Sequence, residues 1–406
     1  MKIDPTKTVS ELINTISYVT NIEGKKNIYH AWRVAIISAK LARKKTDTRL
    51  LKCVFYASLL HDIGGVGFPF HIIHYLKRKD KTSRNILLSH PIIGAQLVSN
   101  IPQMNEIARL ILDHHEWING AGYPRAKIKK YIPLGSQIIR MGDAIDILLQ
   151  TGRYRNLKKM EDKLSLNIGK EYSQDLFDAG LKALKEDRLF HQITGRRNTD
   201  SIFKKTSAAV GLIPIPFKID AIGKTLEFVA QIIDMRHPYS AGHSLRVSRY
   251  ALAIALAMRL EHDEVTRIKW AGLIHDIGKI NISRYIMNKP TKLTEKEFLE
   301  VKKHASHTRK IMGMLPSLKE IVEIASDHHE YFNGSGYPQG LKGNEAPLGA
   351  RILVVCDAFD AMTSNRPYRT SLTPSEACQE IKRLAGQQFD PEIAKISIPL
   401  FKNLGL

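Results

Sequence analysis

Seven histidine and aspartate side chains in the second half of the chain have the types and spacing of a metal-ligand set. They are His243, His275, Asp276, His304, His328, His329 and Asp357. Histidine is the commonest metal ligand, and a carboxylate can bridge two cations. Because the set offers nitrogen and oxygen donors without a thiolate, it favours iron or manganese over structural zinc. The adjacent His275 and Asp276 suit a centre of two ions, since the aspartate can reach one ion while the histidine reaches the same ion or the other.

Asp357 supports this interpretation because it directly follows the apolar run Ile352–Cys356. An unpaired carboxylate buried in such a segment costs several kcal/mol, so it needs a cation or strong hydrogen-bond donors. Two cations held about 3.5–4 Å apart activate water and clamp a phosphodiester for in-line attack. The predicted chemistry is therefore metal-dependent hydrolysis of a phosphodiester.

Four further side chains suit a phosphate group or a base. Lys279 follows His275 closely enough to neutralise phosphate charge, and Tyr337 lies in a loop rich in glycine, where its ring could stack on a base. Arg366 and Arg369 follow Asp357, and two guanidinium groups beside a metal site can read phosphate or guanine. Each of these side chains, taken alone, also fits a solvated surface or a helix cap.

The ligand pattern occurs twice, at one constant offset along the chain. The pair His61-Asp62 reappears as His275-Asp276, and Gly122–Pro124 reappears as Gly336–Pro338. A lone histidine is more often an ordinary core residue, but that reading does not explain a whole set repeated at fixed spacing. The chain is therefore a tandem duplication. Its first half holds a second possible metal site, made of His30, His61, Asp62, His90, His114, His115 and Asp143.

The first half lacks part of the predicted substrate contacts. Gly65 stands where the second half has Lys279, and Gly152 stands where it has Arg366. We therefore expect the first half to keep its metal ligands and to hold substrate less well.

The repeats run from about residue 8 to 190 and from 221 to 406, and residues 191–220 read as a connector with Gly and Pro. Within the repeats the pattern is helical. Ala251–Leu256 is rich in good helix formers, and Pro347–Met362 starts with a proline and continues as an apolar helix. Periodicity alone leaves a buried strand as the alternative for Ile352–Cys356.

Composition indicates a globular protein of ordinary polarity. Of the 406 residues, 43% are hydrophobic and 25% are charged. The net charge of +21 would suit an anionic partner, but basic residues are scattered without interleaved aromatics, so we expect no nucleic-acid partner. The chain has no apolar segment of membrane-spanning length, and its three cysteines form no C-x-x-C motif. We therefore expect a cytoplasmic location.

The second repeat resembles the HD-GYP family of metal phosphohydrolases. The resemblance lies in His275–Lys279, in His328–Pro338, in Asp357–Met362 and in Asn365–Arg369. It implies a helical HD core, an iron or manganese site and hydrolysis of cyclic di-GMP to pGpG or GMP. It also implies that the seven histidine and aspartate residues bind metal, with Asp276 as the bridging ligand.

For the substrate, the resemblance implies contacts by Lys279, Tyr337, Arg366 and Arg369, with Asp276 and Lys279 as catalytic residues. Two departures from the family pattern concern Asn333, where aspartate is usual, and Tyr239, where members with three metals carry glutamate. We therefore expect two metal ions per site.

The predicted fold class is all-α, with two tandem HD-type helical domains: a degenerate HD-GYP-like domain at 8–190 and an intact one at 221–406. The expected partner is a cyclic dinucleotide, and the sequence leaves open a homodimer or an intrachain pseudo-dimer of the repeats. Two other functions stay open. One is hydrolysis of another nucleotide, such as cyclic GMP-AMP or a guanosine polyphosphate. The other is a non-catalytic signalling module that binds cyclic dinucleotides.

Overall fold

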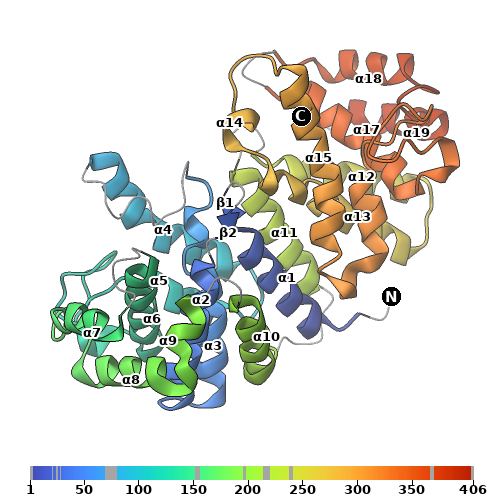
Figure 1. Cartoon of the computed structure of the whole chain (residues 1–406). Coiled ribbons are helices and arrows are strands. Elements are labelled where there is room, and N and C mark those ends of the chain that lie inside the picture. Colours follow the sequence, from blue (N-terminus) through green and yellow to red (C-terminus); the bar gives the residue numbers. More distant parts are fainter. Residues whose placement is uncertain are drawn as a thin grey trace. The chain divides into compact units, whose positions relative to one another are not determined.

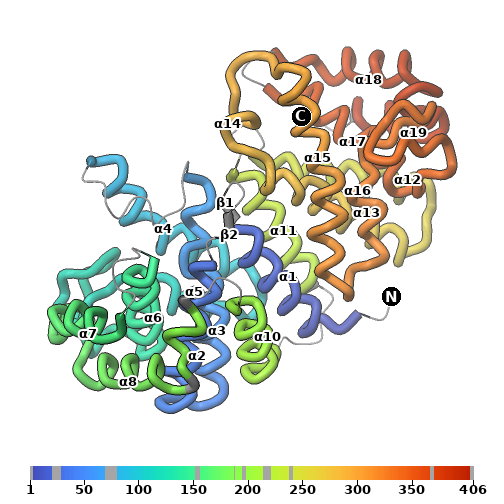
Figure 2. The backbone as a smooth tube through the Cα atoms, viewed as in Figure 1, coloured from blue at the N-terminus to red at the C-terminus, as the bar shows by residue number. Residues whose placement is uncertain are grey.

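The computed structural model describes residues 3–20, 22–23, 26–27, 29–68, 80–150, 156–194, 198–213, 220–236, 241–365 and 370–403. Internal contacts divide the chain into two compact units. The N-terminal unit covers Pro5–Ala221, and the C-terminal unit covers Ile222–Leu406 with Met1–Asp4. Figure 1 labels most of the α-helices of both units, and Figure 2 follows the same path as a tube and labels α16.

Every regular element of three or more residues among the described residues of the C-terminal unit is a helix. Its elements, in order, are α11 (Asp220–Met235), α12 (His243–Ala257), α13 (His262–Ile274), η6 (Ile277–Asn281), α14 (Arg284–Met287), α15 (Glu295–Met312), η7 (Pro316–Ile321), α16 (Val322–Ser326), η8 (Gly343–Glu345), α17 (Leu348–Thr363), α18 (Pro374–Arg383) and α19 (Pro391–Asn403).

The N-terminal unit repeats much of this order. Its helices are α1 (Pro5–Thr20), α2 (His30–Arg43), α3 (Thr48–Leu60), η1 (Ile63–Gly65), α4 (Lys81–Ser99), α5 (Asn105–Leu112), η3 (Lys129–Tyr131), α6 (Leu134–Gln150), α7 (Leu157–Ser165), α8 (Gln174–Lys185), η4 (Glu186–Arg188), α9 (Leu189–Thr194) and α10 (Thr199–Val210). The strands β1 (Ile22–Glu23) and β2 (Lys26–Asn27) form a short antiparallel pair. The all-helical fold class predicted from the sequence is confirmed.

Side-chain caps set where several of these helices begin. Thr294 and Thr373 start α15 and α18 with capping boxes, in which a glutamate three residues later bonds back to the threonine backbone. Asp47 and Asp80 accept hydrogen bonds from backbone N–H groups at the starts of α3 and α4. These caps satisfy N–H groups that a helix start leaves without partners.

The apolar run in the second repeat is a helix. Ile352–Cys356 lies inside α17, which excludes the buried strand that periodicity left open. All five side chains of this run are buried, and α17 packs against α12 and α13. The apolar centre of the C-terminal unit therefore surrounds the helix that carries Asp357.

Part of the segment expected to be a connector is an ordered helix of the N-terminal unit. Helix α10 packs on α2, where Phe203 stacks on Trp32 with ring centroids 4.0 Å apart. Both side chains are buried. The sequence signal for a connector came from two glycines and two prolines. Gly211 directly follows α10, and Gly195, Pro214 and Pro216 lie outside the described ranges.

The three cysteines are free, and Cys356 and Cys378 are buried. None of the described helices is long and apolar enough to cross a membrane.

A glycine after the His-Asp pair lets two elements approach closely in each unit. A Cβ atom on Gly278 would lie 1.9 Å from the carbonyl oxygen of His304 and 2.5 Å from the backbone nitrogen of Thr308. Gly64 meets the equivalent backbone of α4, where a Cβ atom would lie 2.1 Å from the carbonyl oxygen of His90. The absence of a side chain therefore allows η6 to lie directly against α15, and η1 against α4.

Replacement of Gly278 by alanine should destabilise the C-terminal unit by roughly 1–3 kcal/mol, because the added methyl group must push η6 away from α15. Thermal unfolding in the presence of a chelator measures this without a contribution from bound metal. The control is Gly223→Ala in α11, where a Cβ atom would lie an ordinary 3.6 Å from Trp270. Equal melting temperatures for the two variants would contradict the packing argument.

Candidate metal centres

The C-terminal unit brings all seven of its candidate ligands together. Helix α12 begins at His243 and α17 carries Asp357. The other five side chains lie on or directly after α13, α15 and α16, and they are His275, Asp276, His304, His328 and His329. We call these seven residues the C-terminal cluster.

The carboxylate of Asp276 lies at the centre of this cluster. Its Oδ2 atom lies 3.4 Å from Nε2 of His243 and 3.4 Å from Nε2 of His275. Its Oδ1 atom lies 3.6 Å from Nε2 of His304 and 3.9 Å from Nε2 of His328. Each oxygen faces its own pair of rings, so this one carboxylate can serve two cations.

Asp357 supplies the second carboxylate. Its Oδ1 atom lies 3.3 Å from Nε2 of His243, and its Oδ2 atom lies 3.9 Å from Nδ1 of His329. The side chains of Asp357 and His329 are also the more accessible ones of the cluster, with 17% and 19% exposed. This edge of the cluster is therefore open to a ligand.

Hydrogen bonds at Nδ1 orient the rings. In His275, His304 and His328 this atom lies 2.7–2.8 Å from the backbone carbonyl oxygen three residues earlier. Because a carbonyl oxygen only accepts, Nδ1 must carry the proton, and a neutral ring then presents the lone pair of Nε2 to the cluster. Such bonds are the usual support of metal-binding histidines.

The facing ring nitrogens make the cluster fit a metal. The Nε2 atoms of His304 and His328 lie 3.2 Å apart, and those of His243 and His275 lie 3.3 Å apart. Lone pairs at these distances repel each other unless a cation lies between or beside them. The Oδ1 atom of Asp276 is buried without a hydrogen-bond partner. In this cluster, two groups of three residues, each with donor atoms within 4.8 Å of one another, can hold a metal ion.

Protonation of the rings follows from burial and the two carboxylates. Burial lowers the pKa of His304 to about 4 and that of His329 to about 3, which keeps both rings neutral at pH 7. Burial also lowers the pKa of His243, but hydrogen bonds to Asp276 and Asp357 outweigh it and raise this pKa well above its ordinary value. The carboxylates therefore favour a positive charge at this position, either a proton on the ring of His243 or a cation beside it.

Two supporting residues were missed in the sequence. Asp360 lies with Oδ2 at 2.7 Å from Nδ1 of His243, and Arg246 donates from Nε to Oδ1 of Asp360 at 2.6 Å. The carboxylate orients the ring, and the guanidinium compensates the buried charge. Both residues recur in the N-terminal unit as Asp146 and Arg33, and this recurrence was the available signal.

The N-terminal unit assembles its own set in the same way. Oδ1 of Asp62 lies 3.5 Å from Nε2 of His61 and 3.4 Å from that of His90, and Oδ2 lies 3.3 Å from that of His30. Nε2 of His30 and His61 face each other at 3.1 Å, and Nε2 of His90 and His114 face each other at 3.4 Å. Two ligand groups of this N-terminal cluster have donor atoms within 4.8 Å of one another, one of Asp62, His90, His114 and His115 and the other of His30, His61 and Asp143.

The central carboxylates of the two clusters have different neighbours. Lys279 donates from Nζ to Oδ2 of Asp276, whose side chain is 3% exposed. Gly65 lies at the equivalent position of η1, and the side chain of Asp62 is 12% exposed. The positive charge of Lys279 therefore lies next to the central carboxylate of the C-terminal cluster.

The loop after the histidine pair places Tyr337 over the cluster. Its ring packs on that of His329 with centroids 4.7 Å apart, and its backbone nitrogen donates to the carbonyl oxygen of His329 at 3.0 Å. Glu330 fixes the loop by accepting from two backbone N–H groups at 2.6 and 2.9 Å. A Cβ atom on Gly336 would lie 2.2 Å from a backbone nitrogen, so the glycine is needed for this close turn.

Several predicted positions lie outside the described residues. They are Arg366, Arg369, Tyr239 and the segment 152–155. Their roles stay predictions.

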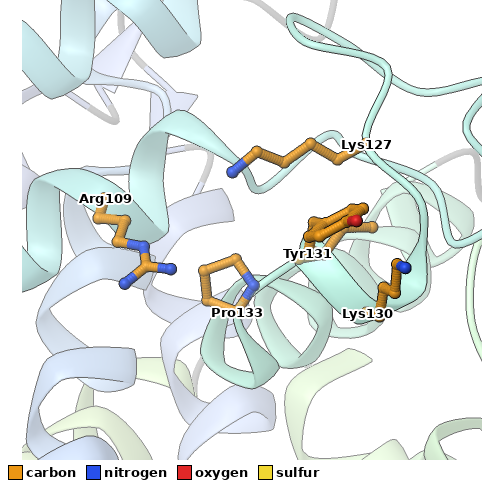
Figure 3. A pocket seen from close by; sticks show the side chains of 6 residues that line it. Arg109, Lys127, Lys130, Tyr131 and Pro133 are labelled. Atoms are coloured by element: carbon orange, nitrogen blue, oxygen red, sulfur yellow. The ribbon is translucent and has the colours of Figure 1, made fainter.

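The N-terminal unit also has a basic pocket away from the cluster residues. It measures about 530 Å³ and is lined by Arg109, Lys127, Lys130, Tyr131, Ile132 and Pro133. Figure 3 shows Arg109 on its helix and Lys127 on a separate loop. Lys127 donates to Asp113 at 2.9 Å, and Lys130 lies over the ring of Tyr131.

These observations define a class: a helical protein with a buried histidine-aspartate cluster for metal in each of two units. Family comparison agrees with this class, because the model of the HD domain matches residues 20–181 and 227–393. The chain therefore belongs to the HD domain family, which confirms the family predicted from the sequence.

Individual relatives fall into two groups. The 3'3'-cGAMP-specific phosphodiesterase 3 of Vibrio cholerae is 28% identical over 79% of this chain and 68% of its own length. The 3'3'-cGAMP-specific phosphodiesterase 1 of the same organism is 27% identical over 90% of this chain and 87% of its own length. The cyclic di-GMP phosphodiesterase of Thermotoga maritima is 37% identical over 46% of this chain and 51% of its own length.

One solved structure covers nearly the whole molecule. The crystal structure of the cyclic GMP-AMP specific phosphodiesterase V-cGAP3 of Vibrio cholerae matches 98% of this chain and 98% of its own, with a TM-score of 0.64 and 22% identity. This likeness concerns the fold.

Replacement of Asp360 by asparagine should weaken metal binding at the C-terminal cluster by about 10–100-fold, because the ring of His243 loses its charged partner. Titration with Mn²⁺ measures this in a chain whose N-terminal cluster is removed by His61→Ala with Asp62→Ala and by His90→Ala with His114→Ala. The control is Glu323→Gln at an exposed position of α16. An affinity equal to that of the control would show that Asp360 does not support the site.

Proposed function

We propose that this protein is a metal-dependent phosphodiesterase of cyclic dinucleotides, with its catalytic centre at the C-terminal cluster. The observation that carries the proposal is the central carboxylate of Asp276, whose two oxygens face two separate pairs of histidine rings. Such an arrangement suits two cations that act together on one phosphodiester. The named activities of the relatives support the same reaction class.

The proposed substrate is cyclic di-GMP, with pGpG, GMP or both as products. A second candidate substrate is 3'3'-cGAMP, which is supported by the length over which the relatives align with this chain. The relatives that align with most of this chain carry that substrate in their names, whereas the more identical relative from Thermotoga maritima aligns with less than half of it.

We propose iron or manganese as the metal. We expect about two ions at the C-terminal cluster, because hydrolases of this kind use a pair of cations to act on one phosphodiester. His243, His275, Asp276 and Asp357 would hold one ion, and Asp276 with His304, His328 and His329 would hold the other. When bound, the ions polarise the phosphodiester and activate water. The nitrogen and oxygen donors and the absence of thiolate among them support this choice of metal.

The remaining roles concern charge and stacking. Asp276 would bridge the ions, and Lys279, already bonded to it, would neutralise charge on the reacting phosphate. Tyr337 lies over His329, where its ring would stack on a base of the substrate. Arg366 and Arg369 would hold phosphate or guanine, as their sequence positions suggest.

We also propose a cytoplasmic location, which the free cysteines support. No nucleic-acid partner is expected.

Purified protein supplied with Mn²⁺ or Fe²⁺ should hydrolyse cyclic di-GMP, and removal of metal should abolish turnover. Parallel assays with cyclic di-GMP and 3'3'-cGAMP, separated by chromatography, identify the preferred substrate and the product. Full turnover by metal-free protein would refute the mechanism. Binding of both nucleotides without hydrolysis under any metal would favour the non-catalytic signalling module.

The two clusters should differ in catalysis. The double change His275→Ala with Asp276→Ala should abolish turnover, and His61→Ala with Asp62→Ala should leave most of it. The physical reason is Gly65, which leaves the N-terminal cluster without the lysine that stabilises developing charge. Loss of one such donor typically costs on the order of 10²–10³ in rate. Equal losses in the two double variants, measured as initial rates, would point to two equivalent sites or one shared site.

A further inference from the structure

Arg140 is a buried arginine beside the N-terminal cluster, and it has no part in the proposed function. It lies on α6, one turn before Asp143, and is 9% exposed. Its Nη1 atom donates to Oδ2 of Asp143 at 2.6 Å, and its Nε atom donates to Glu171 at 3.0 Å. A second guanidinium nitrogen, Nη2, also bonds to Glu171. The guanidinium is thus fixed by two buried carboxylates.

The C-terminal unit has no such group at the equivalent place. Val354, buried in α17 one turn before Asp357, stands where the other unit has Arg140. Gln388 stands where it has Glu171, because the residues just before them accept equivalent backbone hydrogen bonds, Lys170 from Asn119 and Gln387 from Asn333. Both members of the buried pair are therefore specific to the N-terminal unit.

This difference changes the carboxylate that a metal would use. Among the described residues, no lysine or arginine lies within ion-pair distance of Asp357, whose two oxygens face only histidine nitrogens. Asp143 keeps Oδ1 toward His30 at 3.5 Å, but its Oδ2 is taken by Arg140. Lys279 also bonds to a cluster carboxylate, but its ammonium is held only by Asp276 among the described residues, on a flexible side chain that is 18% exposed, so a cation can displace it. The guanidinium of Arg140 is instead fixed between two buried carboxylates, where it offsets the charge of Asp143 and repels a nearby divalent cation.

We propose that Arg140 is a built-in cation that replaces one of two metal ions in the N-terminal cluster. The affected position is the group of His30, His61 and Asp143. A single ion then remains in the group that Arg140 does not touch, made of Asp62, His90, His114 and His115. This inference goes beyond the proposed function, because it concerns the metal content of the other cluster and not turnover.

A single-ion cluster cannot perform the paired-metal reaction, whatever other residues surround it. The N-terminal unit is therefore a metal-binding copy that lacks the paired-metal mechanism. Restoring a lysine at Gly65 alone would not make it catalytic.

The test counts Mn²⁺ in the full chain after removal of both ligand groups of the C-terminal cluster, by His275→Ala with Asp276→Ala and by His304→Ala with His328→Ala. Elemental analysis should find about one ion per chain. The electron paramagnetic resonance spectrum should be that of an isolated Mn²⁺ ion. Adding Arg140→Val with Glu171→Gln, which copies the residues of the C-terminal unit, should raise the content to about two ions and give the spectrum of a spin-coupled pair.

The matched control makes the same substitutions at the exposed pair Arg49 and Glu106, as Arg49→Val with Glu106→Gln, and should leave the content unchanged. Two ions, or none, in the chain with Arg140 intact would overturn the proposal. An unchanged content after the Arg140 and Glu171 substitutions in folded protein, checked by circular dichroism, would overturn it as well. If that variant does not fold, the count with Arg140 intact decides alone. The readout of this test is metal content and not turnover. A finding that the C-terminal cluster is inactive would therefore contradict the proposed function without affecting the result of this test.

Discussion

Buried ring nitrogens that face one another, with buried carboxylates between them, are the constraint around which each unit is organised. Such a group is stable only with positive charge inside it, because lone pairs and carboxylates otherwise repel one another in a medium that screens charge poorly. The helices bring the donors together from distant parts of the chain, and the close approach at Gly64 and Gly278 sets the distance between two of them. Aspartate and arginine behind His30 and His243 then hold the ring and offset the carboxylate charge.

The candidate ligands and the helical fold could be predicted from the sequence because both produce patterns that are visible in a single sequence. A repeated set of histidines and aspartates is visible without any structure, and so are apolar helix patterns. The recurrence of Asp146 as Asp360 was visible in the sequence, but the role of Asp360 was not, since an aspartate in an apolar helix can be a metal ligand or the hydrogen-bond partner of one. The ordered helix α10 was missed because its stability depends on the stacking of Phe203 on Trp32, two residues far apart in the chain.

The asymmetry between the units lies in where each places its basic side chain. The C-terminal unit bonds Lys279 to the central carboxylate and leaves Asp357 to histidines. The N-terminal unit leaves Asp62 without a lysine at Gly65 and bonds Arg140 to the outer carboxylate. Both arrangements offset one negative charge, so the duplicated fold tolerates either one. They differ in which oxygens stay available to a cation.

The bonds that orient the histidines have a consequence for how the duplicated copies could diverge. In each unit, three rings donate to the carbonyl oxygen of the residue three positions earlier in the same segment. The side chains at those acceptor positions differ between the units: Gly272 against Ser58, Val301 against Leu87, and Ala325 against Ile111. Every residue type supplies the same carbonyl oxygen. A change of side chain that the surrounding packing accommodates therefore keeps the acceptor of each ring, so a copy released from selection for catalysis can diverge in sequence and still retain a preorganised set of imidazole donors.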